Sequence, residues 1–221
     1  MKTEMNWRWA PRVFAAMHHG DLVILDARAN AYMVLAQAQG RLRLSTDGAG
    51  ASLIDPSLAD ELQAAGLGAV GAVALRCEPR RIPSASADLD MVAEPDDLGP
   101  SDLWRLLATA TALIWTFWWA PFERLVRANG ATASDDPVAE RRVVRAALAF
   151  RRFLVWIPFQ GLCLYRAALL RQYLGADAAR VTWVFGVSTW PFDAHCWLQC
   201  GELVLNDRLH RVRRYTPIMA V

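Results

Sequence analysis

The chain has 221 residues, of which 54% are apolar and 21% are charged, and its formal net charge is +2. This length allows one domain or two small ones, and the composition is too apolar and too weakly charged for a disordered chain. The small net charge argues against general nucleic-acid binding through phosphate contacts. The low content of Cys, Gly and Pro excludes collagen-like and disulfide-scaffold proteins.

The N-terminal stretch MKTEMNWRWAPR lacks the apolar core of a secretory signal, so we expect a cytoplasmic protein with reduced thiols. Residues 106–122 carry no charge and approach the length of a membrane span, which needs about 20 apolar residues. Because three Thr and a final Pro interrupt this run, we favour a buried or partner-docking helix. Its Trp cluster could also rest on a membrane surface, a contact that we do not favour.

The first 78 residues predict a small module built from a β-hairpin and helices. Residues 22–25 and 31–35 are strand candidates on either side of a short run of turn residues. Tyr32 and Val34 alternate on one face of the second strand. Downstream, Asp55 or Ser57 can cap a helix.

A linker follows this module at residues 79–100, where four Pro lie among Ser, Ala and acidic residues. The composition changes across it, since eight of the ten Trp come after residue 100. The sequence therefore predicts a first domain at 1–78, a linker at 79–100 and a second domain at 101–221.

The second domain is predicted to contain helices followed by strands, which together with the N-terminal hairpin indicates an α+β fold. Ser101 and Asp102 can cap the first helix, and Gly175 closes the third. The predicted helices span 103–119, 138–154 and 162–174, and the predicted strands span 181–187, 194–200 and 203–207.

Three residues of this domain have the types and the order that nucleophilic catalysis requires. Cys163 falls in the first turn of a helix, where unpaired backbone N–H groups and the helix dipole stabilise a thiolate. His195 lies on a strand and could accept the thiol proton, and Asp207 on the returning strand could orient the imidazole. Each residue taken singly also fits an ordinary structural role.

Strand register complicates the assignment of Asp207. With a two-residue turn at 201–202, Asp207 would pair with Cys196 and lie on the face opposite His195. A bulged hairpin, or loss of regular pairing near residue 206, would bring Asp207 to His195. Asn206 is the alternative, because an amide can also orient an imidazole.

Metal binding is the competing interpretation of the same segment. Cys196 and Cys200 lie on one face of their strand, whereas His195 lies on the other, and the sequence contains no C-x-x-C or H-x-x-x-H motif. We therefore expect no metal site. Phosphate-loop and dinucleotide-binding motifs are absent from the sequence as well.

The C-terminal domain resembles that of lasso-peptide biosynthesis B proteins, which are leader peptidases with a transglutaminase-like cysteine protease fold. The resemblance rests on Cys-Leu-x-Arg at 163–166, Phe-x-Ala-His-x-Trp at 192–197 and Leu-Asn-Asp at 205–207. The spacings from Cys to His and from His to Asp also fit. The resemblance implies a catalytic triad of Cys163, His195 and Asp207.

The N-terminal hairpin DLVILDARANAYMVL resembles the opening of small winged-helix-like domains that recognise leader peptides. The stretch GRLRLSTDGAGASLI departs from that pattern, which leaves open a degenerate recognition domain. The resemblance implies that a leader peptide adds as a strand to the hairpin edge and enters a groove beside a helix. Tyr32 and Val34 on the edge, with Leu58 and Leu62 on the helix, are the expected contacts.

By this resemblance, the chain cleaves a ribosomal precursor peptide between leader and core. Gln160 or the backbone N–H of Cys163 would stabilise the oxyanion. The partners would be the precursor peptide and an asparagine-synthetase-like lasso cyclase that closes the macrolactam and docks on helix 103–119. No cofactor is expected on this chain, and any dependence on ATP would act through the cyclase.

Two other functions remain open from the sequence. A transglutaminase-type acyl transferase would share the triad but pass the acyl group to an amine, and so would give a different product mass. A non-catalytic scaffold would bind the leader through residues 1–78 and deliver it to the cyclase.

Overall fold

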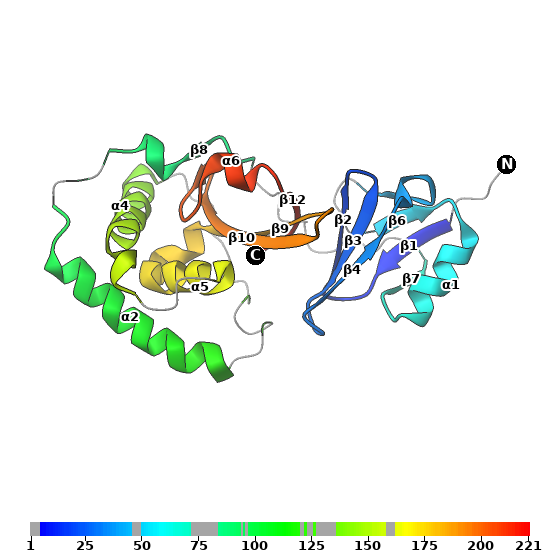
Figure 1. The fold of residues 1–221 in the computed structure, drawn as a ribbon, viewed down its shortest axis with the longest axis horizontal. Coiled ribbons are helices and arrows are strands. Elements are labelled where there is room, and N and C mark those ends of the chain that lie inside the picture. Colours follow the sequence, from blue (N-terminus) through cyan, green and yellow to red (C-terminus); the bar gives the residue numbers. More distant parts are fainter. Residues whose placement is uncertain are drawn as a thin grey trace. The chain divides into compact units, whose positions relative to one another are not determined.

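The computed structural model describes residues 5–45, 50–71, 84–93, 95, 97–119, 122, 126, 136–157 and 162–221, without the side chains of 115–119. The chain forms two compact units (Figure 1). The first consists of Met1–Arg81, Val187–Asp193 and Thr216–Met219, and the second of Ile82–Gly186, Ala194–Tyr215 and Ala220–Val221. The main division thus lies near the start of the expected linker, but two C-terminal segments join the first unit.

The N-terminal part of the first unit is rich in β-structure. Its elements are β1 (Met5–Trp9), β2 (Val13–His18), β3 (Asp21–Asp26), β4 (Ala31–Leu35), the 3-10 turn η1 (Ala38–Gly40), β5 (Leu42–Leu44), β6 (Gly50–Leu53), α1 (Pro56–Ala64) and β7 (Gly68–Val70). The strands form one sheet in the order β5-β6-β1-β7 and a second in the order β2-β3-β4.

The predicted hairpin is confirmed as β3 and β4, which pair antiparallel with Leu25 opposite Tyr32. The predicted helix is confirmed as α1, and its N-cap is Asp55, whose carboxylate accepts the Ser57 N–H. Strands β1 and β2 were not predicted, although buried Trp7 and Trp9 alternate with exposed residues along β1. Because of these strands, the described part of the module is β-rich and has one α-helix, which differs from the expected winged-helix-like arrangement.

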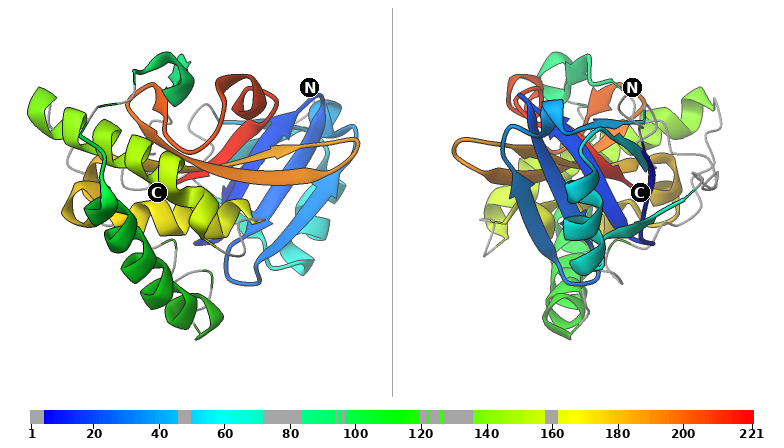
Figure 2. Two further views of the ribbon diagram at one scale, coloured as in Figure 1. Left: turned by 60° about the vertical axis from the view of Figure 1, so that its left-hand side comes forward. Right: turned by 90° about the vertical axis from the view of Figure 1, so that its right-hand side faces the viewer.

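Helix α1 supplies core residues to this module. It packs on β6 and β7, and the right-hand view in Figure 2 shows it lying against the strands. Leu58 and Leu62 are only 1% and 5% exposed, and they belong to the same hydrophobic core as Trp7 and Trp9. This corrects the expectation that Leu58 and Leu62 line a peptide groove, because burial in the core occupies both side chains.

The two faces of the sheet β2-β3-β4 have different partners within the first unit. One face, which carries Leu22 and Ile24, contributes to the core around Trp7. The residues that alternate with these contact the segments 187–193 and 216–219. Trp190 Nε1 donates to Asp21 Oδ2 over 2.6 Å, and His18 Nδ1 hydrogen-bonds with Thr216 Oγ1 over 2.8 Å. The rings of Tyr32 and Phe192 lie 5.4 Å apart.

The C-terminal elements follow the predicted order of helices and then strands. They are β8 (Ala87–Asp88), η2 (Leu89–Met91), α2 (Pro100–Trp119), α4 (Pro137–Phe153), η3 (Leu154–Trp156), α5 (Cys163–Leu174), η4 (Gly175–Arg180), β9 (Thr182–Ser188), β10 (Asp193–Cys200), β11 (Leu203–Val204), α6 (Leu209–Val212) and β12 (Thr216–Ala220). The strands form a five-stranded sheet in the order β12-β9-β10-β11-β8. The three predicted helices are confirmed as α2, α4 and α5.

Part of the expected linker is structured. Within residues 79–100, β8 pairs parallel with β11 and forms the edge of the C-terminal sheet. The carboxylate of Asp88 anchors this segment, because it accepts the backbone N–H groups of Asp90 and Leu209. The Pro content that predicts a linker is also compatible with an edge strand followed by a short turn.

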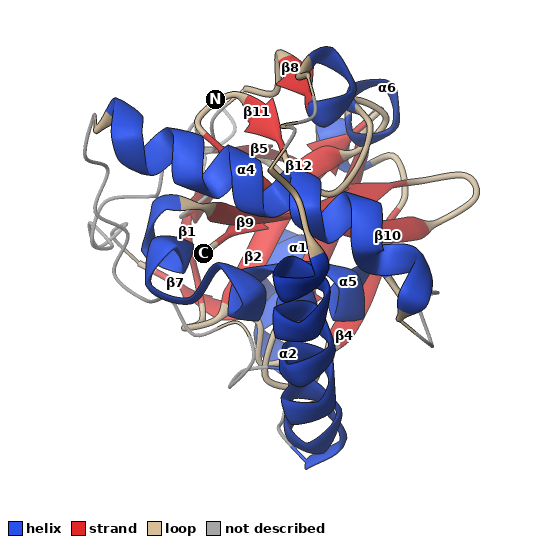
Figure 3. Ribbon diagram, turned by 90° about the vertical axis from the view of Figure 1, so that its left-hand side faces the viewer, coloured by secondary structure: helices blue, strands red, loops and turns tan. Residues whose placement is uncertain are grey.

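Helices α2, α4 and α5 pack against one another (Figure 3). Leu106, Ala110 and Leu113 of α2 are buried at helical spacing, so one face of this apolar helix packs into the core. None of the helices in the described part of the chain is long and apolar enough to cross a bilayer. Between helices, the Arg145 guanidinium pairs with Asp102 at 3.1 Å.

The packing around Gly186 on β9 leaves no room for a side chain. A Cβ atom built there would lie 2.8 Å from Cβ of Tyr215 and 2.9 Å from the ring of Trp197. We predict that Gly186→Ala lowers the free energy of unfolding by about 1–3 kcal/mol, because either the ring or the backbone must shift. Chemical denaturation would measure this. Gly99→Ala is the control, since a Cβ there meets nothing within 4 Å, and equal stability of the two variants would contradict the prediction.

Candidate active site

Cys163 is the first residue of α5, and Leu162 precedes it in an extended conformation as the N-cap. Since Leu162 offers no side-chain cap, the backbone N–H groups of the first turn lack the usual side-chain acceptor. This position places the thiol at the positive end of a helix dipole, where a negative charge on sulfur is stabilised. The thiol is partly buried, and the cysteine is free.

His195 lies near the start of β10, and its side chain is buried, with 6% of its surface exposed. Two aromatic rings hold the imidazole. The ring of Tyr215 is 5.1 Å from it, and the ring of Trp197 is stacked at 6.1 Å. Neither aromatic contact was predicted, although Trp197 lies two residues beyond His195 on the same strand face. The sequence interpretation did not single out Tyr215 as a site residue.

Asp207 lies directly beside His195. Its Oδ2 atom accepts a hydrogen bond from Nε2 of the imidazole. Its Oδ1 atom accepts the backbone N–H of Arg208 over 2.7 Å, and the Arg211 guanidinium lies 3.8 Å from Oδ2. The carboxylate is therefore fixed from both sides, with its charge directed at the ring.

The register of the β10–β11 hairpin explains how Asp207 reaches His195. Cys200 pairs with Leu203 across a two-residue turn, so the hairpin has no bulge there. Regular pairing of β11 ends at Val204, and the side chain of Asn206 then accepts the Leu198 N–H over 2.8 Å. Because the backbone leaves the ladder here, Asp207 is not bound to the face that strict pairing would give it. Of the sequence alternatives, the structure shows loss of pairing near residue 206.

The electrostatics of the site favour a charged pair of Cys163 and His195. A hydrogen bond with the Cys196 side chain, followed by one with His195, lowers the pKa of Cys163 to about 4, although burial opposes this. Burial lowers the pKa of His195, but hydrogen bonds with Asp207 and Cys163 outweigh it and raise that pKa to about 9. Between these two values, the stable form is a thiolate beside an imidazolium.

Asp207 remains ionised in this arrangement. Burial raises the pKa of its carboxyl group, but the hydrogen bond from His195 and the N–H of Arg208 lower it further, to a value below the usual range. The carboxylate therefore keeps its charge and stabilises the imidazolium.

Cys196 is a contact of the thiol that the sequence interpretation missed as a site residue. Its side chain and its backbone both hydrogen-bond with Cys163. Contact with Cys163, and then burial, raise the pKa of Cys196, so this second thiol stays protonated and donates to the thiolate. The adjacent residues His195 and Cys196 thus both hydrogen-bond with Cys163, His195 through its imidazole and Cys196 through its thiol.

Gln160 lies outside the described residues. Val34 on β4 is 42% exposed, whereas the Tyr32 ring contacts Phe192. No group of three His, Cys, Asp or Glu side chains in the described ranges could hold a metal ion.

Such an arrangement can perform acyl transfer. A thiolate is a nucleophile, an imidazolium can protonate a leaving amine, and a carboxylate keeps the ring oriented for both steps. The sequence pattern of the transglutaminase-like superfamily matches residues 106–220, which include all three side chains. The chain belongs to the transglutaminase-like superfamily. Searches of the curated proteins and of the solved structures found no match.

Membership of this superfamily agrees with the α+β architecture of the C-terminal half and suggests cysteine-protease or transglutaminase-type activity. The matched range begins within α2 and ends in β12. It leaves the N-terminal β-rich module outside the match.

The lowered pKa of Cys163 predicts the pH dependence of its reactivity. Because the thiolate is the reactive form, alkylation by iodoacetamide should reach half its maximal rate near pH 4. Mass spectrometry of the labelled protein would follow it, and circular dichroism would verify folding at each pH. His195→Ala should move the half-point upward, since it removes one of the hydrogen bonds to sulfur. A single transition near the ordinary thiol pKa of about 8.5 would rule out the charged pair.

Proposed function

We propose that this chain is a cysteine peptidase that removes the leader from a ribosomally made precursor peptide. The observation that carries the proposal is the group formed by Cys163, His195 and Asp207. It combines a thiol with a pKa of about 4 and a buried imidazole that hydrogen-bonds with a carboxylate. A purely structural cysteine does not need an imidazole with a raised pKa beside it.

In this proposal, the Cys163 thiolate attacks the scissile carbonyl. The imidazolium of His195 gives its proton to the leaving amine, and water then enters to hydrolyse the thioester with His195 as general base. Asp207 holds the ring in place through both steps. The backbone N–H of Cys163, at the start of α5, is suited to stabilise the oxyanion, and Gln160 is the second proposed donor.

The resemblance of the segments around these residues to lasso-peptide B proteins supports the choice of substrate and pathway. The freed core would then be closed to a macrolactam by an asparagine-synthetase-like cyclase. Any need for ATP is assigned to that partner. We propose α2 as its docking surface, because Trp104 on this helix is 71% exposed.

The leader is proposed to add to the edge of the N-terminal sheet. Strand β4 is one of the two edge strands of the sheet β2-β3-β4, so its outer backbone groups can pair with an added peptide strand. The partly exposed side chain of Val34 would contact the peptide, and Tyr32 would contribute through its backbone. Leu58 and Leu62 are left out of this proposal because they are core residues.

Cleavage by the proposed nucleophile can be tested with a precursor peptide encoded beside the gene. Incubation with the native protein, with and without the cyclase, should give separate leader and core masses. Cys163→Ala should give none, because it removes the sulfur that attacks the carbonyl. The matched control is Cys200→Ala, which removes a buried thiol that has a raised pKa.

The masses also separate the alternative functions. Hydrolysis adds the mass of water across the two products, whereas transfer to an amine does not. An uncut precursor that still binds to a folded native protein in the presence of an active cyclase would replace the peptidase by a binding scaffold.

Leader docking has a separate prediction. Val34→Glu places a charge on the exposed edge of β4 and should raise KM about tenfold while leaving kcat unchanged, since the thiol is untouched. Steady-state cleavage rates would measure both constants. Val138→Glu is the control, because Val138 is also exposed but lies on α4. An unchanged KM for Val34→Glu would remove β4 from the proposed docking site.

A further inference from the structure

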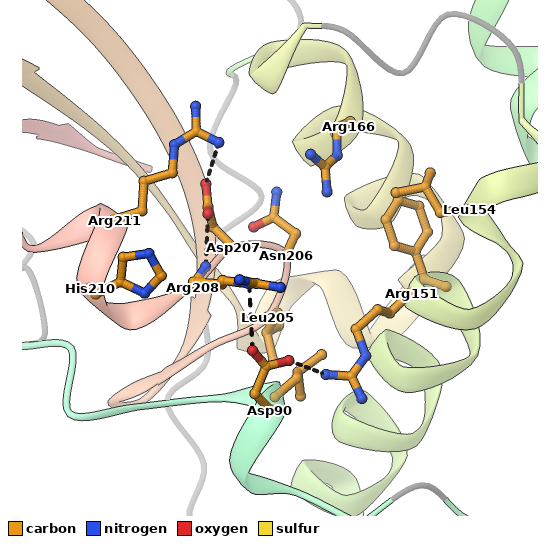
Figure 4. A pocket seen from close by; sticks show the side chains of 12 residues that line it. Asp90, Arg151, Leu154, Arg166, Leu205, Asn206, Asp207, Arg208, His210 and Arg211 are labelled. Carbon is orange, nitrogen blue, oxygen red and sulfur yellow. Dashed lines mark hydrogen bonds and ion pairs between the residues drawn. The ribbon is translucent and has the colours of Figure 1, made fainter.

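A pocket of about 450 Å³ lies in the C-terminal unit, next to Asp207 (Figure 4). Its walls come from η2, α4, α5 and the segment 205–211. Cys163 and His195 are not among the residues that line it, so the pocket touches the proposed triad through Asp207 alone. The chemistry of the other lining residues is therefore considered separately from the attack on a peptide bond.

The pocket is positively charged. Four arginines and two aspartates line it, which leaves an excess of two positive charges. The arginines approach from different elements, as Figure 4 shows: Arg151 from α4, Arg166 from α5, and Arg208 and Arg211 from the start and middle of α6. Guanidinium groups thus surround the cavity from several directions.

The two aspartates neutralise only part of the charge of these arginines. Asp90 is shared by Arg151 at 3.0 Å and Arg208 at 3.6 Å. Asp207 already accepts the hydrogen bond of His195, and Arg211 stays 3.8 Å from it. Both carboxylates therefore already have partners, and neither is paired with the fourth arginine.

Arg166 is that fourth arginine. Its Nε atom is buried and has no hydrogen-bond partner among the described residues. A buried guanidinium N–H without an acceptor is costly, because it has lost its water. This side chain lines the pocket from one turn beyond Cys163 on the same helix, and it is available to an acceptor that enters the cavity.

We propose that this pocket binds the phosphate group of a small ligand. Guanidinium groups bind phosphate through paired hydrogen bonds and are preferred where such recognition is needed. A tetrahedral anion accepts donors from several directions, as the placement on α4, α5 and α6 requires, whereas a carboxylate accepts them mainly in one plane. Leu89, Phe150 and Leu154 form an apolar wall, which suits the organic part of a phosphate ester.

Phosphate binding here does not depend on whether Cys163 acts as a nucleophile, so this proposal and the peptidase proposal can fail separately. The two are nevertheless close in space. Arg211 lines the pocket and also faces Asp207, so a bound phosphate would place negative charge one side chain away from the carboxylate that holds His195.

Isothermal titration calorimetry of the full chain tests the proposal. Inorganic phosphate and phenyl phosphate are titrated at constant ionic strength, which removes general salt effects. We expect saturable binding of one ligand per chain. Arg166→Gln and Arg151→Gln should each weaken it about tenfold or more, because each removes a charge-assisted donor. Arg214→Gln removes an equal charge from an exposed position outside the pocket and should change the affinity less than about twofold.

The two ligands distinguish the sources of the phosphate. Tighter binding of phenyl phosphate indicates an organic phosphate ester that uses the apolar wall, whereas equal affinity indicates the free anion. Absence of saturable binding by the native protein would overturn the proposal. An equal loss in Arg214→Gln would do the same, because it would show attraction by net charge alone. If thermal unfolding shows that Arg166→Gln does not fold, Arg151→Gln on another helix decides the outcome.

Discussion

The hydrogen bond between His195 and Asp207 is the interaction around which the C-terminal site is organised. It requires that an aspartate three residues beyond the end of β11 reach a ring on β10. The chain achieves this by ending the strand early and by using the Asn206 side chain to satisfy the backbone of Leu198. The same bond keeps the imidazole protonated against its burial. The Cys196 side chain and then the protonated ring lower the pKa of Cys163 and keep it ionised. The early end of β11 thus contributes to the charges of His195 on β10 and Cys163 on α5.

The aromatic contacts around His195 extend this dependence into the packing of the sheet. Tyr215 and Trp197 contact the imidazole, and both also occupy the space that a side chain at position 186 on β9 would need. The absence of a side chain at Gly186 is therefore part of how the imidazole is positioned. Helix α5 supplies the third residue of the site, because Cys163 is its first residue. The geometry of the site therefore depends on where α5 begins and where β11 ends, on either side of His195 in β10.

Much of the C-terminal half could be predicted from the sequence, because its helices have clear caps and regular apolar spacing. Gly175, for example, was expected to close the third helix and stands at the end of α5. The order of Cys, His and Asp also identified the three residues that lie together. Periodicity could not decide the face on which Asp207 lies, since this depends on where pairing stops. The contact of Cys196 with Cys163 was missed because strand alternation assigns Cys196 to the face opposite His195, whereas its thiol and backbone both reach Cys163.

The N-terminal half was harder to predict. Its first strand, β1, is short and mixes Trp with Arg, so it resembles neither an apolar strand nor a helix. The core positions of Leu58 and Leu62 depend on strands that the sequence did not predict. Contacts between residues far apart in the sequence were harder still to predict. The face of β2-β3-β4 that carries Asp21 and Tyr32 is covered by residues some 170 positions later in the chain, Trp190 and Phe192 among them.

This sharing of segments has a consequence for how such a chain could arise by gene fusion. If an independent N-terminal protein had simply been joined to a transglutaminase-like protein, each piece would be expected to complete its own surface. Here the first unit is assembled from three separate stretches of chain, and two of them follow the start of the superfamily match. Separating the two halves at residue 81 would leave Asp21 without its indole donor and would expose one side of a sheet. A cut at residue 81 therefore does not separate the two units, because two C-terminal segments belong to the first unit.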